Sequence, residues 1–297
     1  MKTPSPSPLD LRLGLNRGVL RKTLSVLAPL FACATFSHAA VLLSENFNGL
    51  NTGNLGGQNN WTANAALQVA AGGLSYTSTS GTIKVLGGTQ HSTWTNANIA
   101  PLGSKNFVSQ TGDVWFSLTI NVTATTTNSR FWFYVSNDAD LNDSGVVGQI
   151  FSGSGALGTG ARIGSNQTGP TGASTTLPGQ TTLFIVGHYS QSAVGGTATV
   201  GDYDKMEMWV NPDSTTLGVG FTAINTTDAS GATAISTFAL SALTASGTGA
   251  TVLWDNLLVG TTQADVLDVY AIPEPSTYAA IGGLAALGLA TLRRRRG

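Results

Sequence analysis

The stretch VWFSLTINV, at residues 114–122, decides the fold class because its side chains alternate in kind. Apolar side chains occupy the even-numbered positions, whereas Trp115, Ser117, Thr119 and Asn121 occupy the odd ones. Successive side chains of a β-strand point to opposite faces, so this alternation predicts a strand from Asp113 to Val122 with one buried face. The opposite face carries a tryptophan among polar side chains.

The same alternation recurs along the chain and predicts many short strands. At residues 130–136, Phe131, Phe133 and Val135 alternate with Trp132 and Tyr134. Further strands are expected at 41–47, 74–77, 82–86, 146–151, 183–189, 204–210, 217–221, 235–240 and 251–259, separated by Gly, Asn, Asp and Pro. Residues 153–180, rich in Gly, Ser and Thr, are expected to form a long loop with at most one short strand. The pattern predicts an all-β fold, an antiparallel β-sandwich of the jelly-roll kind.

The first 39 residues have the pattern of a secretory signal peptide. Basic residues precede an apolar run at 24–36, and Ser37-His38-Ala39 places small residues at the positions that a signal peptidase reads. Cleavage is expected before Ala40. Signal peptidase and the Sec export machinery are therefore expected partners.

The last 26 residues, 272–297, have the pattern of a second targeting signal. Pro273, Glu274 and Pro275 precede an apolar run at 279–292, and a block of arginines follows it: Arg293, Arg294, Arg295 and Arg296. A helix over residues 278–292 would span about 22 Å at ~1.5 Å per residue, somewhat less than the ~30 Å hydrocarbon core of a bilayer. We expect a single, marginal transmembrane helix with its arginines on the cytoplasmic side.

Between the two terminal signals, the expected mature protein consists of a sandwich domain at 40–262 and a linker at 263–271. Residues 40–271 contain 13 acidic and five basic residues, a net charge of −8, whereas the whole chain has −1. Such an acidic domain is a poor nucleic-acid binder. The single cysteine, Cys33, lies in the signal peptide, so neither a disulfide nor thiol chemistry is expected in the mature domain.

The tail resembles the PEP-CTERM sorting signal of Gram-negative bacteria, whose three parts are present here in order. Three short motifs, LSENF at 43–47, MEMWVNP at 206–212 and LWDNL at 253–257, resemble exported PEP-CTERM proteins with a concanavalin A-like (laminin G-like) sandwich. The resemblance implies that residues 41–47 pair with 251–259. It also implies an exosortase-type membrane protease as partner, a transient inner-membrane intermediate, and a final place at the cell surface or in the extracellular matrix.

One pattern of carboxylates has the spacing of a catalytic motif. Residues 202–207, DYDKME, have the Glu-x-Asp-x-x-Glu spacing of laminarinase-like glucanases, with Asp202 in place of the first Glu. Strand alternation separates Asp202 from Glu207, which is expected beside Lys205 and Trp209 on the opposite face. His91 and the histidine at 188 are interpreted as ordinary strand or loop residues. We therefore predict that the chain is not an enzyme, with a divergent glycoside hydrolase or lyase as an alternative.

Aromatic side chains opposite the apolar row form a candidate glycan site. Trp115, Trp132 and Tyr134 lie on that face, and Tyr203 and Trp209 are candidates for the same surface. Sugar rings stack on flat aromatic surfaces, so these residues could bind polysaccharide. The alternative is that loops bury this second face as well.

A cluster of oxygen ligands at 137–145 is a candidate calcium site. Asp138, Asp140, Asn142 and Asp143 provide it, but Asp143 stands where an EF-hand needs glycine. An Asx-rich hairpin turn is the alternative. No other cofactor is expected.

Together these features predict an exported, non-catalytic protein of the cell surface or extracellular matrix, sorted by its tail and associated with exopolysaccharide. A glycan-binding, lectin-like module and a divergent glycoside hydrolase are the alternative functions.

The tail interpretation predicts a processed product. Intact-mass analysis of protein extracted from the cell surface is expected to show loss of residues 293–296, because an exosortase would cut near Pro273-Glu274-Pro275 and leave the helix behind. Surface protein that retains the arginine block would contradict this prediction.

Overall fold

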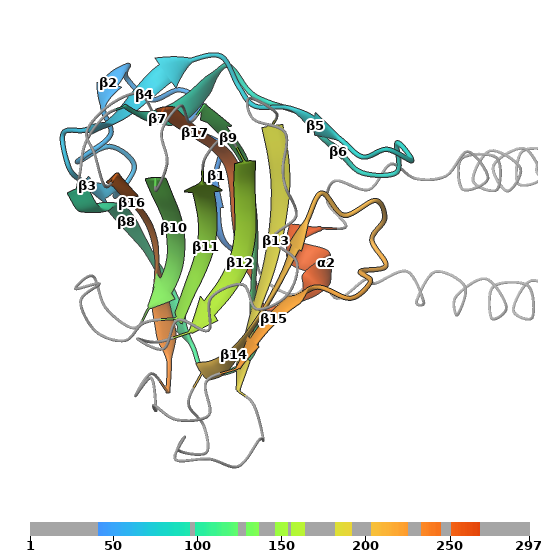
Figure 1. Cartoon of the computed structure of the whole chain (residues 1–297). Coiled ribbons are helices and arrows are strands. Elements are labelled where there is room, and N and C mark those ends of the chain that lie inside the picture. The colour runs from blue at the N-terminus through green and yellow to red at the C-terminus, as the bar shows by residue number, and fades with distance from the viewer. Residues whose placement is uncertain are drawn as a thin grey trace, which may run out of the picture. The chain divides into compact units, whose positions relative to one another are not determined.

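Antiparallel strands form nearly all of the part of the chain that the structure describes. In the computed structural model, that part comprises residues 41–95, 99–123, 129–136, 146–153, 156–163, 182–191, 203–224, 233–244 and 251–267. It contains seventeen strands and one short helix, α2 (Gln263–Val266). The strands form two large sheets and a two-stranded ribbon of β5 (Tyr76–Thr77) and β6 (Lys84–Val85), as Figure 1 shows.

The larger sheet, sheet A, has nine strands. Its order is β15 (Phe221–Ile224), β14 (Tyr203–Val210), β13 (Thr182–Gln191), β9 (Val114–Thr123), β17 (Thr251–Gly260), β7 (Gln90–Thr95), β4 (Leu67–Ala71) and β2 (Gly53–Asn54). The ninth strand, β1 (Val41–Glu45), pairs antiparallel with the second half of β17. The pairing of the first and last strands that the family resemblance implied is thus present, from Val41 opposite Gly260 to Glu45 opposite Leu257.

The second sheet, sheet B, has six strands. Its order is β12 (Ala156–Ile163), β11 (Val146–Gly153), β10 (Ser129–Ser136), β16 (Ile235–Thr244), β8 (Ile99–Gln110) and β3 (Thr62–Ala63). The inner faces of the two sheets meet in one apolar core, so the prediction of an all-β antiparallel sandwich is confirmed.

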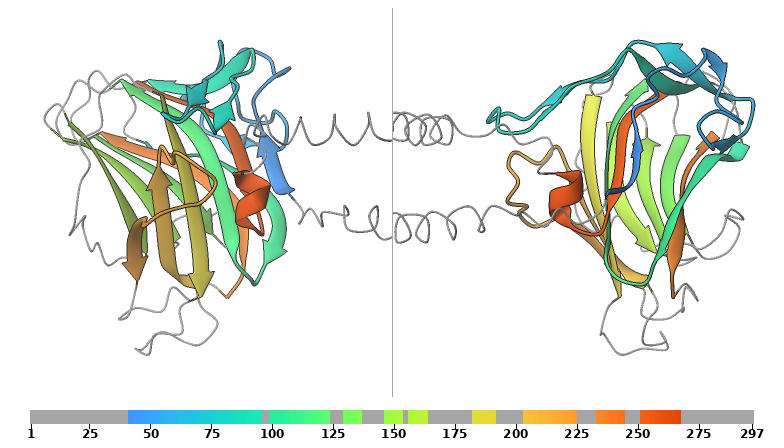
Figure 2. Two further views of the ribbon diagram at one scale, coloured as in Figure 1. Left: turned by 90° about the vertical axis from the view of Figure 1, so that its right-hand side faces the viewer. Right: turned by 180° about the vertical axis from the view of Figure 1, so that it is seen from behind.

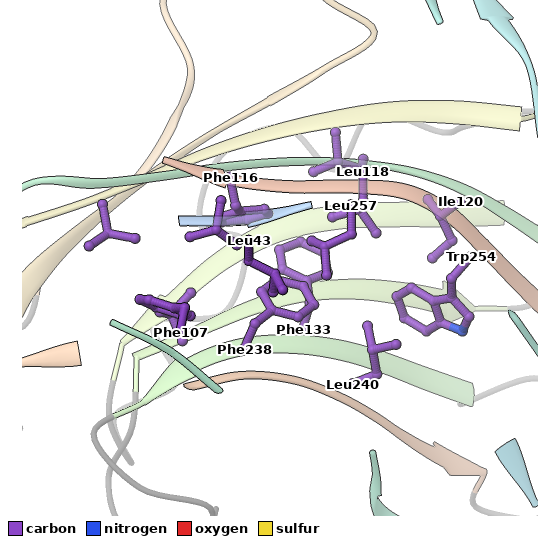
Figure 3. Close-up of a cluster of buried hydrophobic side chains, with 14 of the residues drawn as sticks. Leu43, Phe107, Phe116, Leu118, Ile120, Phe133, Phe238, Leu240, Trp254 and Leu257 are labelled. Atoms are coloured by element: carbon purple, nitrogen blue, oxygen red, sulfur yellow. The ribbon is translucent and has the colours of Figure 1, made fainter. Parts of the chain in front are cut away.

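The centre of this core is the ring of Phe116 on β9. It lies 5.0 Å from the ring of Phe133 on β10 and 5.9 Å from that of Phe238 on β16, both in sheet B. Figure 3 shows these rings among their aliphatic neighbours. Gly187 on β13 lies opposite Phe116, and a Cβ atom there would come within 2.0 Å of the ring. Glycine at this position therefore lets the ring lie over the neighbouring strand.

A buried ion pair joins the two sheets near β1. Lys105 Nζ of β8 donates to Glu45 Oε2 at 2.7 Å, and both side chains are less than a tenth exposed. The same carboxylate accepts hydrogen bonds from Asn59 Nδ2, Trp61 Nε1 and the backbone N–H of Phe47. A buried charge is tolerated when it is paired and its oxygens are satisfied in this way.

The outer face of sheet A carries a second, smaller core. It consists of Ile83, Val85, Phe184, Val186, Val266 and Leu267. The β5–β6 ribbon and α2 supply the covering residues, and Figure 2 shows α2 against the outside of the sheet. Residues 263–267, which the sequence placed in a linker, therefore belong to the fold. Thr262 caps α2 in a reciprocal arrangement with Asp265.

Several strands were not recognised from the sequence. β4 and β7 were missed, and β7 is polar, with His91 and Ser92 buried. β12 lies within residues 153–180, which were expected to form a loop. Its glycines interrupt any alternation of apolar side chains, so the sequence pattern does not indicate a strand there. The strand expected at 217–221 begins only at Phe221, since Leu217 instead packs against the second core.

The two terminal signals lie outside the described residues. Within those residues, no helix is long and apolar enough to cross a membrane. The predicted signal peptide, sorting motif and transmembrane helix stay predictions.

A buried aspartate on β17 holds in place the segment of chain that leads into the β5–β6 ribbon. The carboxylate of Asp255, 1% exposed, accepts hydrogen bonds from the N–H groups of Leu74 and Asn256 at 2.9 and 2.8 Å. Asn256 adopts a positive φ of 53° at a break in the register between β17 and β9. Burial raises the pKa of Asp255 to about 6, although these backbone hydrogen bonds oppose the shift.

This raised pKa predicts a specific dependence of stability on pH. The pKa of Asp255 in the folded chain, about 6, is above its unfolded value of 3.8. Its contribution to stability is therefore full below the unfolded pKa and is lost as pH rises through about 6. The free energy of unfolding from urea denaturation is expected to fall between about pH 4 and pH 7, by at most about 3 kcal/mol from this group.

Two variants isolate the Asp255 contribution. Asp255→Asn should remove this part of the pH slope, at the cost of lower stability throughout because an amide has one acceptor oxygen. Asp213→Asn, a matched change at an exposed aspartate, should keep the slope. An unchanged slope in Asp255→Asn would contradict the assignment.

Candidate functional site

A group of aromatic and charged side chains reaches the surface beside the second core. Alternation places them there: Phe116, Gly187 and Met208 face the main core, so their chain neighbours on β9, β13 and β14 face outward. We call the group the outer cluster, and its members are Asp113, Trp115, His188, Lys205, Glu207 and Trp209. Trp115 is opposite His188 in the sheet, and His188 is opposite Glu207.

The aromatic members form a parallel stack. The rings of Trp115 and His188 lie 4.1 Å apart at an angle of 13°, and the rings of Trp115 and Trp209 lie 5.8 Å apart at 12°. Both indoles pack partly against the second core and are half-buried. Much of the flat surface of Trp115 is thus in contact with its two neighbours. This differs from the open platform that was one of the two interpretations of the sequence, and is nearer to the alternative in which the second face is covered.

The charged members are arranged around the imidazole of His188. Nδ1 lies 3.2 Å from Glu207 Oε2, and Nε2 lies 3.3 Å from Asp113 Oδ2. Lys205 Nζ lies 3.0 Å from the same oxygen of Glu207. Nδ1 is within hydrogen-bond distance of Glu207, whereas Nε2 makes no hydrogen bond in the described part of the chain.

The environment of Glu207 favours its ionised form. Partial burial raises its pKa, but hydrogen bonds from Lys205 and His188 outweigh this effect and hold the pKa below its usual value. Glu207 is therefore a carboxylate at neutral pH, able to accept hydrogen bonds or a proton. The side chain of Asp113 is 58% exposed and presents the open carboxylate of the cluster.

A groove of about 370 Å³ adjoins the stack at Trp209. The loop between β14 and β15, residues 211–220, forms most of its wall. Trp209 Nε1 donates to the carbonyl oxygen of Gly218 at 2.7 Å, which fixes the indole against this loop. Small-molecule sites typically occupy about 300–1,000 Å³, so the groove could hold a short oligosaccharide segment.

The first residues of this loop are anchored to the sheet and to the ribbon. Asn211, at a positive φ of 51°, exchanges two hydrogen bonds with the backbone of Phe184 on β13. Asp213 accepts a hydrogen bond from the N–H of Ser80 in the β5–β6 ribbon at 2.6 Å. The wall of the groove is therefore tied to the cover of the second core.

The structure separates the aromatic residues that the sequence grouped together. Trp115 and Trp209 stack in sheet A, whereas Trp132 and Tyr134 belong to β10, a strand of sheet B. Tyr203 is fully buried, and its hydroxyl donates to the carbonyl oxygen of Gln110. A register break beside Ser190 turns Tyr203 inward, so the expectation that it was exposed is wrong.

The candidate calcium ligands Asp138, Asp140, Asn142 and Asp143 lie outside the described residues, as do Pro273, Glu274 and Pro275 and the four arginines. In the described ranges, no three His, Cys, Asp or Glu side chains come together as a metal site would require.

His188 and Asp113 were not predicted as site residues from the sequence. A weak signal existed for Asp113, since it lies two positions before Trp115 and so on the same face of the strand. No local signal marked His188, because its contacts depend on the pairing of β13 with β9 and β14.

Comparison with known proteins concerns the fold. No family model matches the sequence, and no curated protein is similar to it. Among solved structures, an alginate lyase, Aly36B, bound to alginate tetrasaccharide is 14% identical, with a TM-score of 0.47 over 75% of this chain and 98% of its own. The cellulose-induced protein Cip1 is 18% identical, with a TM-score of 0.41 over 74% and 97%. A glycoside hydrolase of the GH43 kind is 11% identical, with a TM-score of 0.39 over 77% and 42%. These are carbohydrate-related β-sandwich proteins.

The comparison corrects one prediction from the sequence. The chain was predicted not to be an enzyme, but the similar structures include alginate lyases and a glycoside hydrolase. Residues 202–207 bear only on the carboxylate arrangement of laminarinase-like glucanases. Other glycan-cleaving enzymes use other catalytic side chains. The exclusion of catalysis is therefore withdrawn.

Proposed function

We propose that this chain is an exported protein that binds polysaccharide through the outer cluster and the adjoining groove. The observation that carries the proposal is the pair of half-buried, stacked indoles of Trp115 and Trp209 beside the charged groups of Asp113, Glu207 and Lys205. This combination lies on the outer face of sheet A, beside the second core.

The chemistry of this surface matches that of a sugar. A pyranose ring presents apolar C–H groups together with a rim of hydroxyls. Indoles supply large apolar area with little loss of conformational entropy, and charged side chains form the stronger hydrogen bonds. Because Trp209 belongs both to the stack and to the groove, a sugar in the groove would contact its indole.

Packing alone does not account for the exposure of these rings. Phe184 and Val186 on the same face are fully buried under the ribbon and α2. The two tryptophans could have been covered in the same way. Large aromatic side chains that stay half-exposed beside polar groups are typical of binding surfaces.

The terminal segments support a role outside the cytoplasm. The signal peptide and the PEP-CTERM-like tail would send the chain through the Sec machinery to an exosortase-type protease at the inner membrane. The processed domain, a jelly-roll sandwich of the concanavalin A-like kind, would then act at the cell surface or in the exopolysaccharide matrix.

Glycan cleavage at the same cluster is the second candidate function. The observation that favours it is an imidazole with each nitrogen facing a carboxylate, His188 between Asp113 and Glu207. Proton transfer during the cleavage of a glycosidic bond requires paired acidic and basic groups of this kind.

Polysaccharide binding predicts a loss of affinity when the exposed ring is removed. Trp209→Ala in the full chain should weaken binding to immobilised polysaccharides at least tenfold in affinity electrophoresis, because the ring contributes both to the stack and to the groove. Val108→Ala on β8, where the side chain is 73% exposed in sheet B, is the control and should bind normally. Equal binding by both variants would contradict this location of the site.

The catalytic alternative predicts released product. Incubation of the full chain with β-glucans should release reducing ends, and incubation with polyuronates should release unsaturated ends that absorb ultraviolet light. Glu207→Gln should abolish either release. Thermal unfolding of Glu207→Gln controls for misfolding. Binding without any product from either polymer would leave binding as the function.

A further inference from the structure

The outer cluster and its groove also limit the chemical class of ligand. On the basis of the proposed function, we infer that the bound polysaccharide carries no negative charge, so that uronate and sulfated polymers are disfavoured ligands. The inference comes from where the described carboxylates and cations lie.

The open charges of this surface are acidic. Asp113 presents a 58% exposed carboxylate, with a contact to His188 at 3.3 Å. Asp213 is exposed and lines the groove on the far side of Trp209. A polymer lying along the stack and the groove would therefore pass two carboxylates.

Of the three described lysines, two are paired with a carboxylate and the third points away from the sheet. Lys205 pairs with Glu207 at 3.0 Å, and Lys105 is buried against Glu45 at 2.7 Å. Lys84 lies on β6 between Ile83 and Val85, which face the second core, so it points away from the sheet. Both arginines of the described strands, Arg130 and Arg162, belong to sheet B.

Recognition of an anionic sugar needs the reverse arrangement. Carboxylate and sulfate groups are bound by guanidinium groups in bidentate geometry or by unpaired lysines. A polyuronate would instead bring a carboxylate on every residue towards Asp113 and Asp213. The net charge of −8 over residues 40–271 adds to this repulsion.

An uncharged sugar uses the same groups favourably. Its hydroxyls can donate to the carboxylate oxygens of Asp113 and Glu207. Its C–H groups can contact the indole of Trp209. None of these contacts requires an unpaired cation.

The test compares two hexasaccharides of equal length by calorimetry on the full chain, a neutral glucan and an alginate oligomer. At low ionic strength, the glucan is expected to bind at least tenfold tighter. The difference should shrink in 0.5 M salt, because exposed charges are screened over a Debye length of only several ångströms.

Two variants with the same change in charge locate the effect. Asp113→Asn should reduce the preference for the glucan several-fold, because it removes the open carboxylate. Val108→Lys, on the exposed surface of sheet B, likewise raises the net charge by one and should leave the preference unchanged. An equal effect of the two variants would overturn the role of Asp113.

The outcomes separate the inference from the proposed function. Alginate binding as tight as glucan binding, and lost in Trp209→Ala, would overturn the inference while the binding site stands. Absence of binding to either sugar would overturn both.

Discussion

The burial of Phe116 between the two sheets is the contact on which the rest of the structure depends. Its ring meets Phe133 and Phe238 of sheet B, and Gly187 leaves room for it on the neighbouring strand. Because side chains alternate along a strand, this one burial determines the orientation of all of β9. A shift by one residue would place Trp115 in the core and expose Phe116. The candidate site is thus a consequence of core packing.

The outer face of sheet A has two adjacent parts, a covered part and the candidate site. One part is covered by the ribbon and α2, and the other carries the stacked rings and charges. The loop at 211–220 belongs to both parts, since Asn211 bonds to β13 and Trp209 bonds to Gly218. A ligand in the groove would therefore contact a wall that is anchored at both ends, which lowers the entropic cost of binding.

Much of the sandwich followed from the sequence, and the site followed only in part. The alternation at 114–122 correctly predicted which side chains of β9 face the main core, because that pattern is local, but Ser117 and Thr119 on the other face are buried as well. The polar strand β7 and the glycine-rich strand β12 carry no such pattern. Trp115 and Trp209 were found as single residues. His188 was not, because its role comes from pairings between strands that are distant in the chain.

The position of β17 also has a consequence for how the chain reaches its destination. This strand is the last of the sandwich in sequence, yet it lies in the middle of sheet A, with β9 on one side and β7 and β1 on the other. Until residues 251–260 are available, the sheet is split into two halves and its first strand has no partner. Translation proceeds from the N-terminus, so sheet A can be completed only when nearly the whole domain has been synthesised. For a chain exported as proposed, this order of strands would keep the domain unfolded while it passes through the translocation channel.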